Sequence, residues 1–241
     1  MKGRNPAFAT TRWSLVVKAG VEKTSQSQAA LETLCNTYWY PLYAYVRRRG
    51  HDADAAADLT QGFFAAFLAS DGVAGARQDR GRFRSYLLAS LSHFISNQRD
   101  KANALKRGGG KTPIPIDTAG AETRYGLEPA HEVTPERLFD RRWALTLLEG
   151  VLGQLRAEYA KRGRGPLFDR LKPFLTGDGE RGMQGKAAAD LGLSEGAVKV
   201  AVHRMRARYR DLIRRHIADT VADPEQVDEE LRDLFAALSG G

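Results

Sequence analysis

The sequence contains one cysteine, Cys35, in 241 residues, which excludes an intramolecular disulfide. Cys35 lies among apolar residues such as Leu34 and Tyr38, a setting that predicts a buried, reduced thiol rather than a nucleophile. No segment approaches the roughly 20 apolar residues of a membrane-spanning helix, and the N-terminus has no apolar signal core. These absences predict a soluble protein that stays in the cytoplasm.

Signatures of catalysis and metal binding are also absent. No nucleophile elbow accompanies the serine, histidine and carboxylate residues, and no His/Cys spacing suggests zinc. The acidic run at 51–58, HDADAAAD, lacks the turn glycine and the terminal glutamate of a calcium loop. We therefore expect no catalytic residue, no metal and no cofactor.

Basic residues are in excess, with 37 Lys and Arg against 29 Asp and Glu, a net charge of +8. Arg77–Lys111 holds nine basic and two acidic residues, and Lys186–His216 holds eight and three. Ala218–Gly241 reverses the sign, with one basic and seven acidic residues. The two basic segments favour an anionic partner, nucleic acid ahead of a membrane surface.

Apolar residues recur at steps of three and four, which predicts helices. In the N-terminal half three helices are indicated, carried by Leu31, Leu34, Tyr38, Leu42 and Val46, by Leu59, Phe63 and Phe67, and by Phe83, Leu87, Leu91, Phe94 and Ile95. Thr134 and Pro135 predict a further helix start, and 167–175 predicts a short helix. No alternating strand pattern of useful length occurs, so the predicted fold class is all-α.

The Gly, Pro and Thr content of residues 106–134, without a sustained apolar period, predicts a flexible linker between two small helical domains. The predicted order is an N-terminal extension (1–30), a first domain (31–105), the linker (106–134), a second domain (135–217) and an acidic tail (218–241).

The tail has one apolar face, formed by Val227, Leu231, Leu234, Phe235 and Leu238. This pattern predicts a short acidic helix packed on the second domain. The sharper alternative is that the tail covers a basic DNA-binding surface.

The stretch KAAADLGLSEGAVKVAVHRMRARYR, Lys186–Arg210, predicts a helix-turn-helix. Ala188 is small enough for the helix contact, Gly192 tolerates a positive φ in the turn, and Ser194 caps the second helix. The shared core is expected to contain Ala187, Leu191, Leu193, Val198, and Ala201 or Val202.

The second helix then presents a groove-facing set, consisting of Ser194, Glu195, Gly196, Lys199, Val200, His203, Arg204 and Arg206. The N-terminal residues of a recognition helix meet base edges, and arginines beside them neutralise phosphates. The alternative is that these arginines only solvate one face of a packing helix. Spacing, turn and cap together favour DNA binding, and they leave repressor, activator and initiation factor open.

The N-terminal half discriminates among these classes. In Tyr40–Ala69 the residues Asp54, Asp58, Leu59, Thr60, Gln61 and Phe64 match the order Asp-x-x-x-Asp-Leu-x-Gln-x-x-Phe. This run resembles region 2 of bacterial sigma factors of the extracytoplasmic-function group, and residues 80–109 are similar to the promoter-melting helix of that family. The helix-turn-helix is similar to region 4. The resemblance covers about 31–215.

The resemblance implies an alternative sigma factor, a promoter-selecting subunit of RNA polymerase and not an enzyme in its own right. Its partners would be core RNA polymerase and promoter DNA, with an anti-sigma factor or another regulator as a further candidate. Region 2 would dock on the clamp helices of the largest subunit, and region 4 on the flap. The docking residues would be Asp54, Asp58, Leu59, Gln61 and Phe64. The minus-ten residues would be Arg82, Arg84, Tyr86, His93, Asn97, Arg99 and Lys101. The groove-facing set would bind the minus-thirty-five element.

Two other classes stay open. One is a stand-alone, dimeric helix-turn-helix transcriptional regulator whose N-terminal domain senses a signal or binds a partner. The other, a nucleic-acid-modifying enzyme, is supported only by the basic charge.

Overall fold

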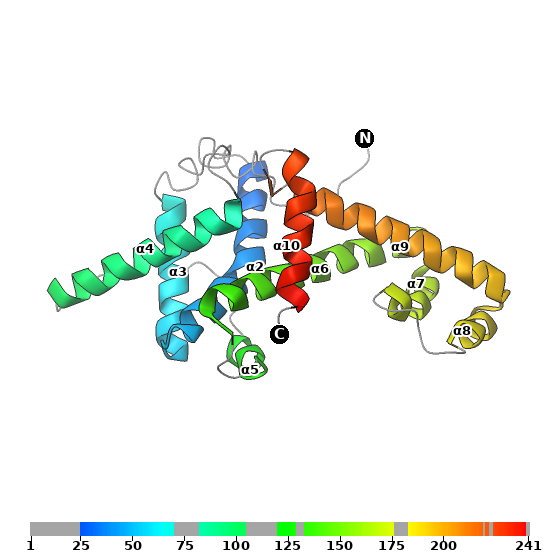
Figure 1. Ribbon diagram of the computed structural model, residues 1–241, viewed down its shortest axis with the longest axis horizontal. Coiled ribbons are helices and arrows are strands. Elements are labelled where there is room, and N and C mark those ends of the chain that lie inside the picture. Colours follow the sequence, from blue (N-terminus) through cyan, green and yellow to red (C-terminus); the bar gives the residue numbers. More distant parts are fainter. Residues whose placement is uncertain are drawn as a thin grey trace. The chain divides into compact units, whose positions relative to one another are not determined.

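The computed structural model describes residues 25–69, 82–104, 120–128, 133–175, 183–218, 220–221 and 224–239 (Figure 1). This part of the chain contains helices and no strand, which confirms the predicted all-α class. The helices are α2 (Ser25–Arg48), α3 (Ala53–Ala69), α4 (Phe83–Ala104), α5 (Ala121–Gly126), α6 (Pro135–Lys161), α7 (Gly165–Leu171), η3 (Lys172–Leu175), α8 (Met183–Leu191), α9 (Glu195–Ala218), η4 (Pro224–Gln226) and α10 (Val227–Ser239).

The chain divides into two compact units. Unit 1 comprises residues 1–146 and 217–241, and unit 2 comprises residues 147–216. Both divisions fall inside a helix, in α6 and in α9. The units therefore differ from the two segments that the composition of 106–134 indicated, since the start of α6 and all of α10 belong to unit 1.

Unit 1 is built on an aromatic core between α2, α3 and α4, the three helices that the apolar spacing predicted. The rings of Tyr38 on α2 and Phe83 pack edge to face, with their centroids 5.5 Å apart. The ring centroids of Phe63 on α3 and Phe94 on α4 lie 5.9 Å apart. Cys35 is a buried free thiol, as expected. These contacts fix α4 against the other two helices.

The end of the predicted linker is a folded part of unit 1. Glu122 on α5 accepts hydrogen bonds from Tyr43 at 2.6 Å and from Arg47 at 2.5 and 3.0 Å. Glu128 accepts one from Tyr40 at 3.0 Å and pairs with Arg142. Residues 120–128 are thus held on α2 and α6, because their carboxylates find partners that composition does not reveal.

The predicted tail helix exists as α10, and its predicted packing partner is corrected. Val227 and Leu234 are buried. The carboxylates of Glu230 and Asp233 pair with Arg82 and with Arg84, at the start of α4 in unit 1. The sequence periodicity located the helix but carried no information about which basic residues it meets.

Unit 2 contains the predicted helix-turn-helix. Helix α8 ends in a turn in which Leu193 N–H donates to the Ala188 carbonyl at 2.9 Å and Gly192 N–H to the Ala189 carbonyl at 3.3 Å. This pattern requires a left-handed residue, and Gly192 has φ of 63°. The Ala197 N–H donates to Ser194 Oγ at 3.2 Å, which confirms the predicted cap.

The core of the helix-turn-helix agrees with the prediction except at two positions. Ala187, Ala188, Val198 and Val202 are buried, as expected. Met205 and Leu212, which continue the same face of α9, are also buried. Leu191 is only half-buried, and Leu193 is 42% exposed. Leu193 points outward because it follows the left-handed glycine, where the chain leaves the α8 axis.

The turn generates a stability prediction. We expect Gly192→Ala to lower the free energy of unfolding by about 1 kcal/mol, because an L side chain is strained at positive φ. The control is Gly196→Ala in the first turn of α9, where an added Cβ meets only Ser194 Oγ at 3.9 Å. That change should be neutral or raise the free energy of unfolding by up to about 1 kcal/mol. Urea unfolding followed by circular dichroism measures both, and equal losses would contradict the assignment.

Candidate nucleic-acid interface

The first half of α9 presents the groove-facing set to solvent. Val198, Val202 and Met205 are buried against the rest of unit 2, so the residues between them lie on the open side of the helix. Seven of the eight predicted residues are exposed, namely Ser194, Glu195, Gly196, Lys199, Val200, His203 and Arg204. Val200 is the largest apolar member, at 50% exposure. An exposed aliphatic side chain among cations suits contact with a thymine methyl group.

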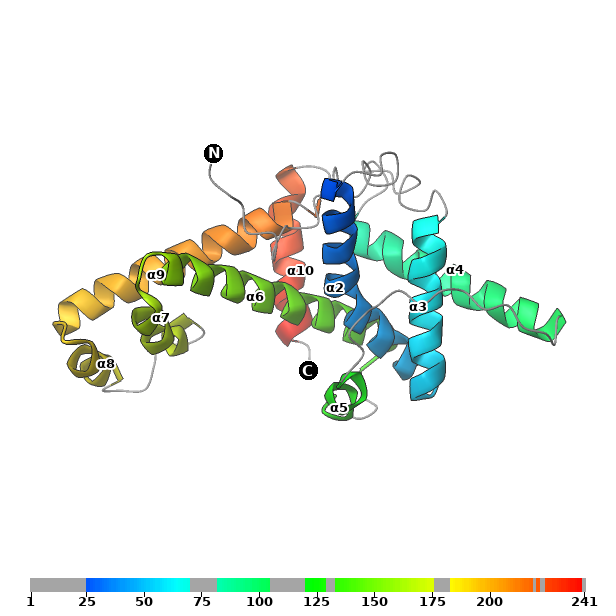
Figure 2. The ribbon, with the colours of Figure 1, turned by 180° about the vertical axis from the view of Figure 1, so that it is seen from behind.

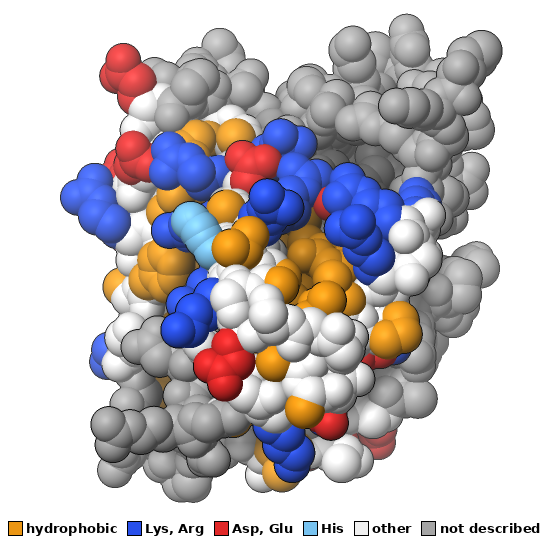
Figure 3. Space-filling model, turned by 90° about the vertical axis from the view of Figure 1, so that its right-hand side faces the viewer, with side chains coloured by type: hydrophobic (Ala, Val, Ile, Leu, Met, Phe, Trp, Pro, Cys, Tyr) orange, Lys and Arg blue, Asp and Glu red, His pale blue; other side chains and the backbone are white. Residues whose placement is uncertain are grey.

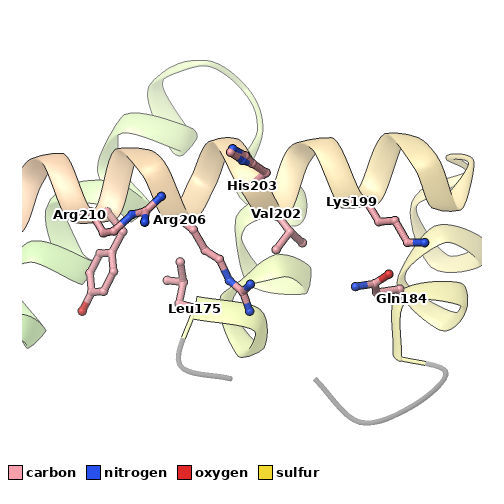
Figure 4. Close-up of a pocket in the computed structure, with 8 residues that line it drawn as sticks. Leu175, Gln184, Lys199, Val202, His203, Arg206 and Arg210 are labelled. Carbon is pink, nitrogen blue, oxygen red and sulfur yellow. The ribbon is translucent and has the colours of Figure 1, made fainter. Parts of the chain in front are cut away.

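A hollow of about 400 Å³ lies beside this face. Figure 4 shows Lys199 and Gln184 pointing toward one another at one end, and Arg206 beside Leu175 further along α9. The hollow is completed by Val202, His203, Tyr209 and Arg210. Its lining is cationic and polar over an apolar floor, which suits a sugar-phosphate backbone better than an apolar ligand.

Two arginines of α9 hold unit 2 together. Arg206 Nε donates to the carbonyl of Phe174 at 2.8 Å and is half-buried. Arg208 donates to both carboxylate oxygens of Glu158 on α6, at 2.8 and 2.6 Å, and to Asp211 at 2.9 Å. Arg206, predicted in the groove-facing set, is thus also a structural residue, since its guanidinium ties α9 to η3.

Other cations on this face have no such tie. Among the residues that the structure describes, no acidic side chain pairs with Lys199, Arg204 or Arg210, and all three are exposed. Figure 3 shows Lys and Arg side chains gathered around apolar surface when unit 2 is seen from the side of α8 and the start of α9. Unpaired cations on an open helix face leave a positive potential that attracts phosphate.

Gly185 on α8 lies close to the first turn of α9. A Cβ at this position would lie 3.0 Å from Glu195 Oε1, the far end of an exposed side chain that can turn away. Four residues outside the predicted groove-facing set also line the hollow, namely Leu175, Gln184, Tyr209 and Arg210. Leu175 and Gln184 precede the stretch 186–210 on which the prediction was based.

The second predicted surface lies on α3 in unit 1, where some of its residues are exposed and others are not. Asp54 and Asp58 are exposed, and Leu59 and Gln61 are half-buried. Phe64 is 0% exposed, so its inclusion among the docking residues is corrected. The helical period turns Phe64 into the aromatic core, while Asp58 and Asp54, six and ten residues earlier, face solvent.

The predicted minus-ten residues include an exposed group and an occupied group, the latter being arginines that already pair with carboxylates. His93, Asn97 and Arg99 are exposed on α4. The end of α4 projects beyond α2 and α3 (Figures 1 and 2). Tyr86 is half-buried, with its ring 6.1 Å from that of Phe67. The side chain of Lys101 lies outside the described residues.

Arg82 and Arg84 form the occupied group. Arg84 is 6% exposed, and its guanidinium lies 4.3 Å from the centroid of the Trp143 ring. Its assignment as an accessible phosphate contact is corrected for this conformation. Burial raises the pKa of Glu230, its principal partner, although the charges of Arg84 and Arg82 oppose that rise.

Other kinds of site find no support in the described part of the chain. No helix there is long and apolar enough to cross a membrane, and no group of three or more His, Cys, Asp or Glu side chains is arranged to hold a metal. No protein-family model, curated protein or solved structure matches the chain. We therefore infer function from the geometry of these residues.

The Arg208–Glu158 pair generates a pH prediction. The hydrogen bonds from Arg208 hold the pKa of Glu158 below its ordinary 4.5. The pair then stabilises unit 2 fully above that ordinary pKa and loses its effect as the pH falls through the lowered pKa. We expect Glu158→Gln to lower the free energy of unfolding by about 1 kcal/mol at neutral pH. The difference from the wild type should shrink as the pH falls below 4.5 and through the lowered pKa. Urea unfolding across this range tests it, and a constant difference would contradict it.

Proposed function

We propose that this chain is an alternative sigma factor of the extracytoplasmic-function type, which binds core RNA polymerase and directs it to promoters. The observation that carries the proposal is the capped helix-turn-helix of α8 and α9, with Lys199, Arg204 and Arg210 exposed and unpaired among described residues. A helix in this setting fits the major groove, with its N-terminal residues against bases and its arginines on phosphates.

The α3 surface supports a protein partner. Asp54 and Asp58 lie on one exposed edge of a helix whose opposite side is packed with phenylalanines. A rigid helix with a carboxylate edge and the half-buried Gln61 offers directional contacts to a basic surface. We assign this edge to the clamp helices of the largest polymerase subunit, in line with the resemblance of the Asp-x-x-x-Asp-Leu-x-Gln pattern.

Exposed residues of α4 support contact with a melted strand. His93 provides an exposed ring, Asn97 donors and acceptors, and Arg99 a cation. Opened bases need surfaces on which to stack and groups that satisfy their edges. We assign minus-ten binding to these three residues and minus-thirty-five binding to the groove-facing set of α9.

In this proposal RNA synthesis belongs to the polymerase, and the chain acts without a catalytic residue or cofactor of its own. It works in the cytoplasm, at the nucleoid when bound to polymerase. Its two DNA-binding parts correspond to regions 2 and 4, joined through the segment 106–134. An anti-sigma factor or another regulator is a candidate further partner.

Binding to polymerase is tested by co-elution with bacterial core RNA polymerase in size-exclusion chromatography. We expect the wild type to co-elute and Asp58→Arg to weaken binding at least about tenfold, because a like charge replaces a complementary one at the interface. Glu149→Arg, an equal charge change at an exposed position of α6, is the control and should bind as the wild type does. A wild type that elutes alone and binds duplex DNA as a dimer would favour the stand-alone regulator.

Binding to duplex DNA is tested with Lys199→Ala/Arg204→Ala. We expect a weaker salt dependence. The negative slope of log affinity against log salt concentration should become shallower by about 1.8, because each phosphate contact removed takes away about 0.9. Arg162→Ala/Arg164→Ala removes two exposed arginines at the end of α6 and should leave the slope unchanged. Fluorescence anisotropy with duplex DNA at several salt concentrations measures both. Equal slopes for the two double variants would show that the charge effect is not localised on α9.

A further inference from the structure

The start of α4 is covered by acidic side chains in a way that simple packing does not require. Arg82 faces three carboxylates of α10, with Nη2 3.0 Å from Glu229, Nε 2.8 Å from Glu230, and Nη1 against Asp233. Every nitrogen of this guanidinium therefore has an acidic partner on one helix.

Arg84 is occupied to the same degree. Its Nη1 lies 2.7 Å from Glu230 and its Nη2 3.4 Å from Asp233, both on α10, and its Nε lies 3.3 Å from Asp140 on α6. A guanidinium has five N–H donors in a planar fork that suits carboxylates and phosphates equally. While α10 is in place, each guanidinium nitrogen of Arg82 and Arg84 already has a carboxylate partner with which a phosphate would have to compete.

Arg82 and Arg84 belong to the basic segment Arg77–Lys111. About two helical turns after them, α4 reaches its exposed residues. Beside them α10 presents the partly exposed carboxylates of Glu229 and Asp233. These carboxylates would repel a DNA backbone approaching the same end of the helix. The contact thus removes two cations from the surface and adds negative charge in their place.

We propose that α10 is an autoinhibitory segment that occupies, with its carboxylates, the phosphate-binding arginines at the start of α4. The proposal rests on the proposed function, since it assigns α4 to promoter DNA. DNA contact at this end of α4 requires α10 to leave or its rim carboxylates to be neutralised.

The exposed fractions of the α10 carboxylates indicate which of their ion pairs with the two arginines break most easily. Glu230 is almost fully buried, and its side chain anchors the helix beside Val227 and Leu234. Glu229 and Asp233 are 59% and 39% exposed at the rim, where water competes for Arg82. Rim pairs of this kind contribute little net stability, so they can be exchanged for other anions.

The test uses the full chain with Glu229→Gln/Asp233→Asn, which leaves Glu230 and the buried apolar contacts intact. The probe is a fluorescent single-stranded DNA of mixed sequence, titrated at several salt concentrations. For single strands each added phosphate contact steepens the slope of log affinity against log salt by about 0.7. We expect a steepening of about 0.7 as Arg82 becomes available. A chain that ends at residue 221 should gain about 1.4, since Arg84 is also released.

The control is Glu225→Gln/Asp228→Asn. It removes the same charge from the same segment without removing a carboxylate that the structure pairs with Arg82 or Arg84. Its salt slope should stay that of the wild type. Adding Arg82→Ala to Glu229→Gln/Asp233→Asn should abolish the gain.

The outcomes separate this inference from the function on which it rests. If the wild type co-elutes with core polymerase and the rim variant binds the strand no differently from the control, α10 is only a packing element and the inference is overturned. The truncated chain alone cannot decide this, because loss of Val227 and Leu234 can unfold unit 1. If the wild type does not bind polymerase, the proposed function fails and the assignment of α4 to promoter DNA falls with it.

Discussion

The guanidinium of Arg84 is the charge on which unit 1 depends. It is buried, lies over the Trp143 ring of α6, and pairs with Glu230 of α10 and Asp140 of α6. A buried cation without a carboxylate partner costs several kcal/mol, on the order of 3 to 5. Four parts of the sequence must therefore meet at one point: the start of α4, the middle of α6, α10, and through Trp143 the aromatic side of Tyr38.

This constraint explains why α10 is held against α4. The apolar contacts of α10 are few, with Val227 and Leu234 as its buried hydrophobic residues. Its position is set instead by directional ion pairs, which a different anion of similar geometry can replace. Unit 2 uses charge in the opposite way. There Arg206 and Arg208 are committed to the fold, and Lys199, Arg204 and Arg210 are left on the open face of α9.

Local patterns made much of the fold predictable. The three-four spacing of apolar residues located α2, α3, α4 and α10, and the Gly192 turn with its Ser194 cap follows from residue chemistry at adjacent positions. The exposed edge of α3 was predicted correctly at Asp54 and Asp58, but Phe64 was not, because a pattern match does not say which side of a helix faces the core.

Long-range pairing could not be predicted. Arg84 and Glu230 are separated by 146 positions, and Tyr43 and Glu122 by 79. Any exposed-looking arginine in a basic run can pair with any acidic residue, and only the folded chain selects the partner. For this reason composition predicts a linker at 120–128, and the resemblance places Arg82 and Arg84 on DNA, although the folded chain pairs both arginines with carboxylates.

The most direct measurement is transcription reconstituted from bacterial core RNA polymerase, a supercoiled library of genomic fragments and this chain, with the 5′ ends of the RNA mapped by sequencing. If the chain is a sigma factor, discrete 5′ ends appear only when it is present, and they share sequence elements at a fixed spacing upstream. The same distribution of 5′ ends with and without the chain would contradict promoter selection by this protein.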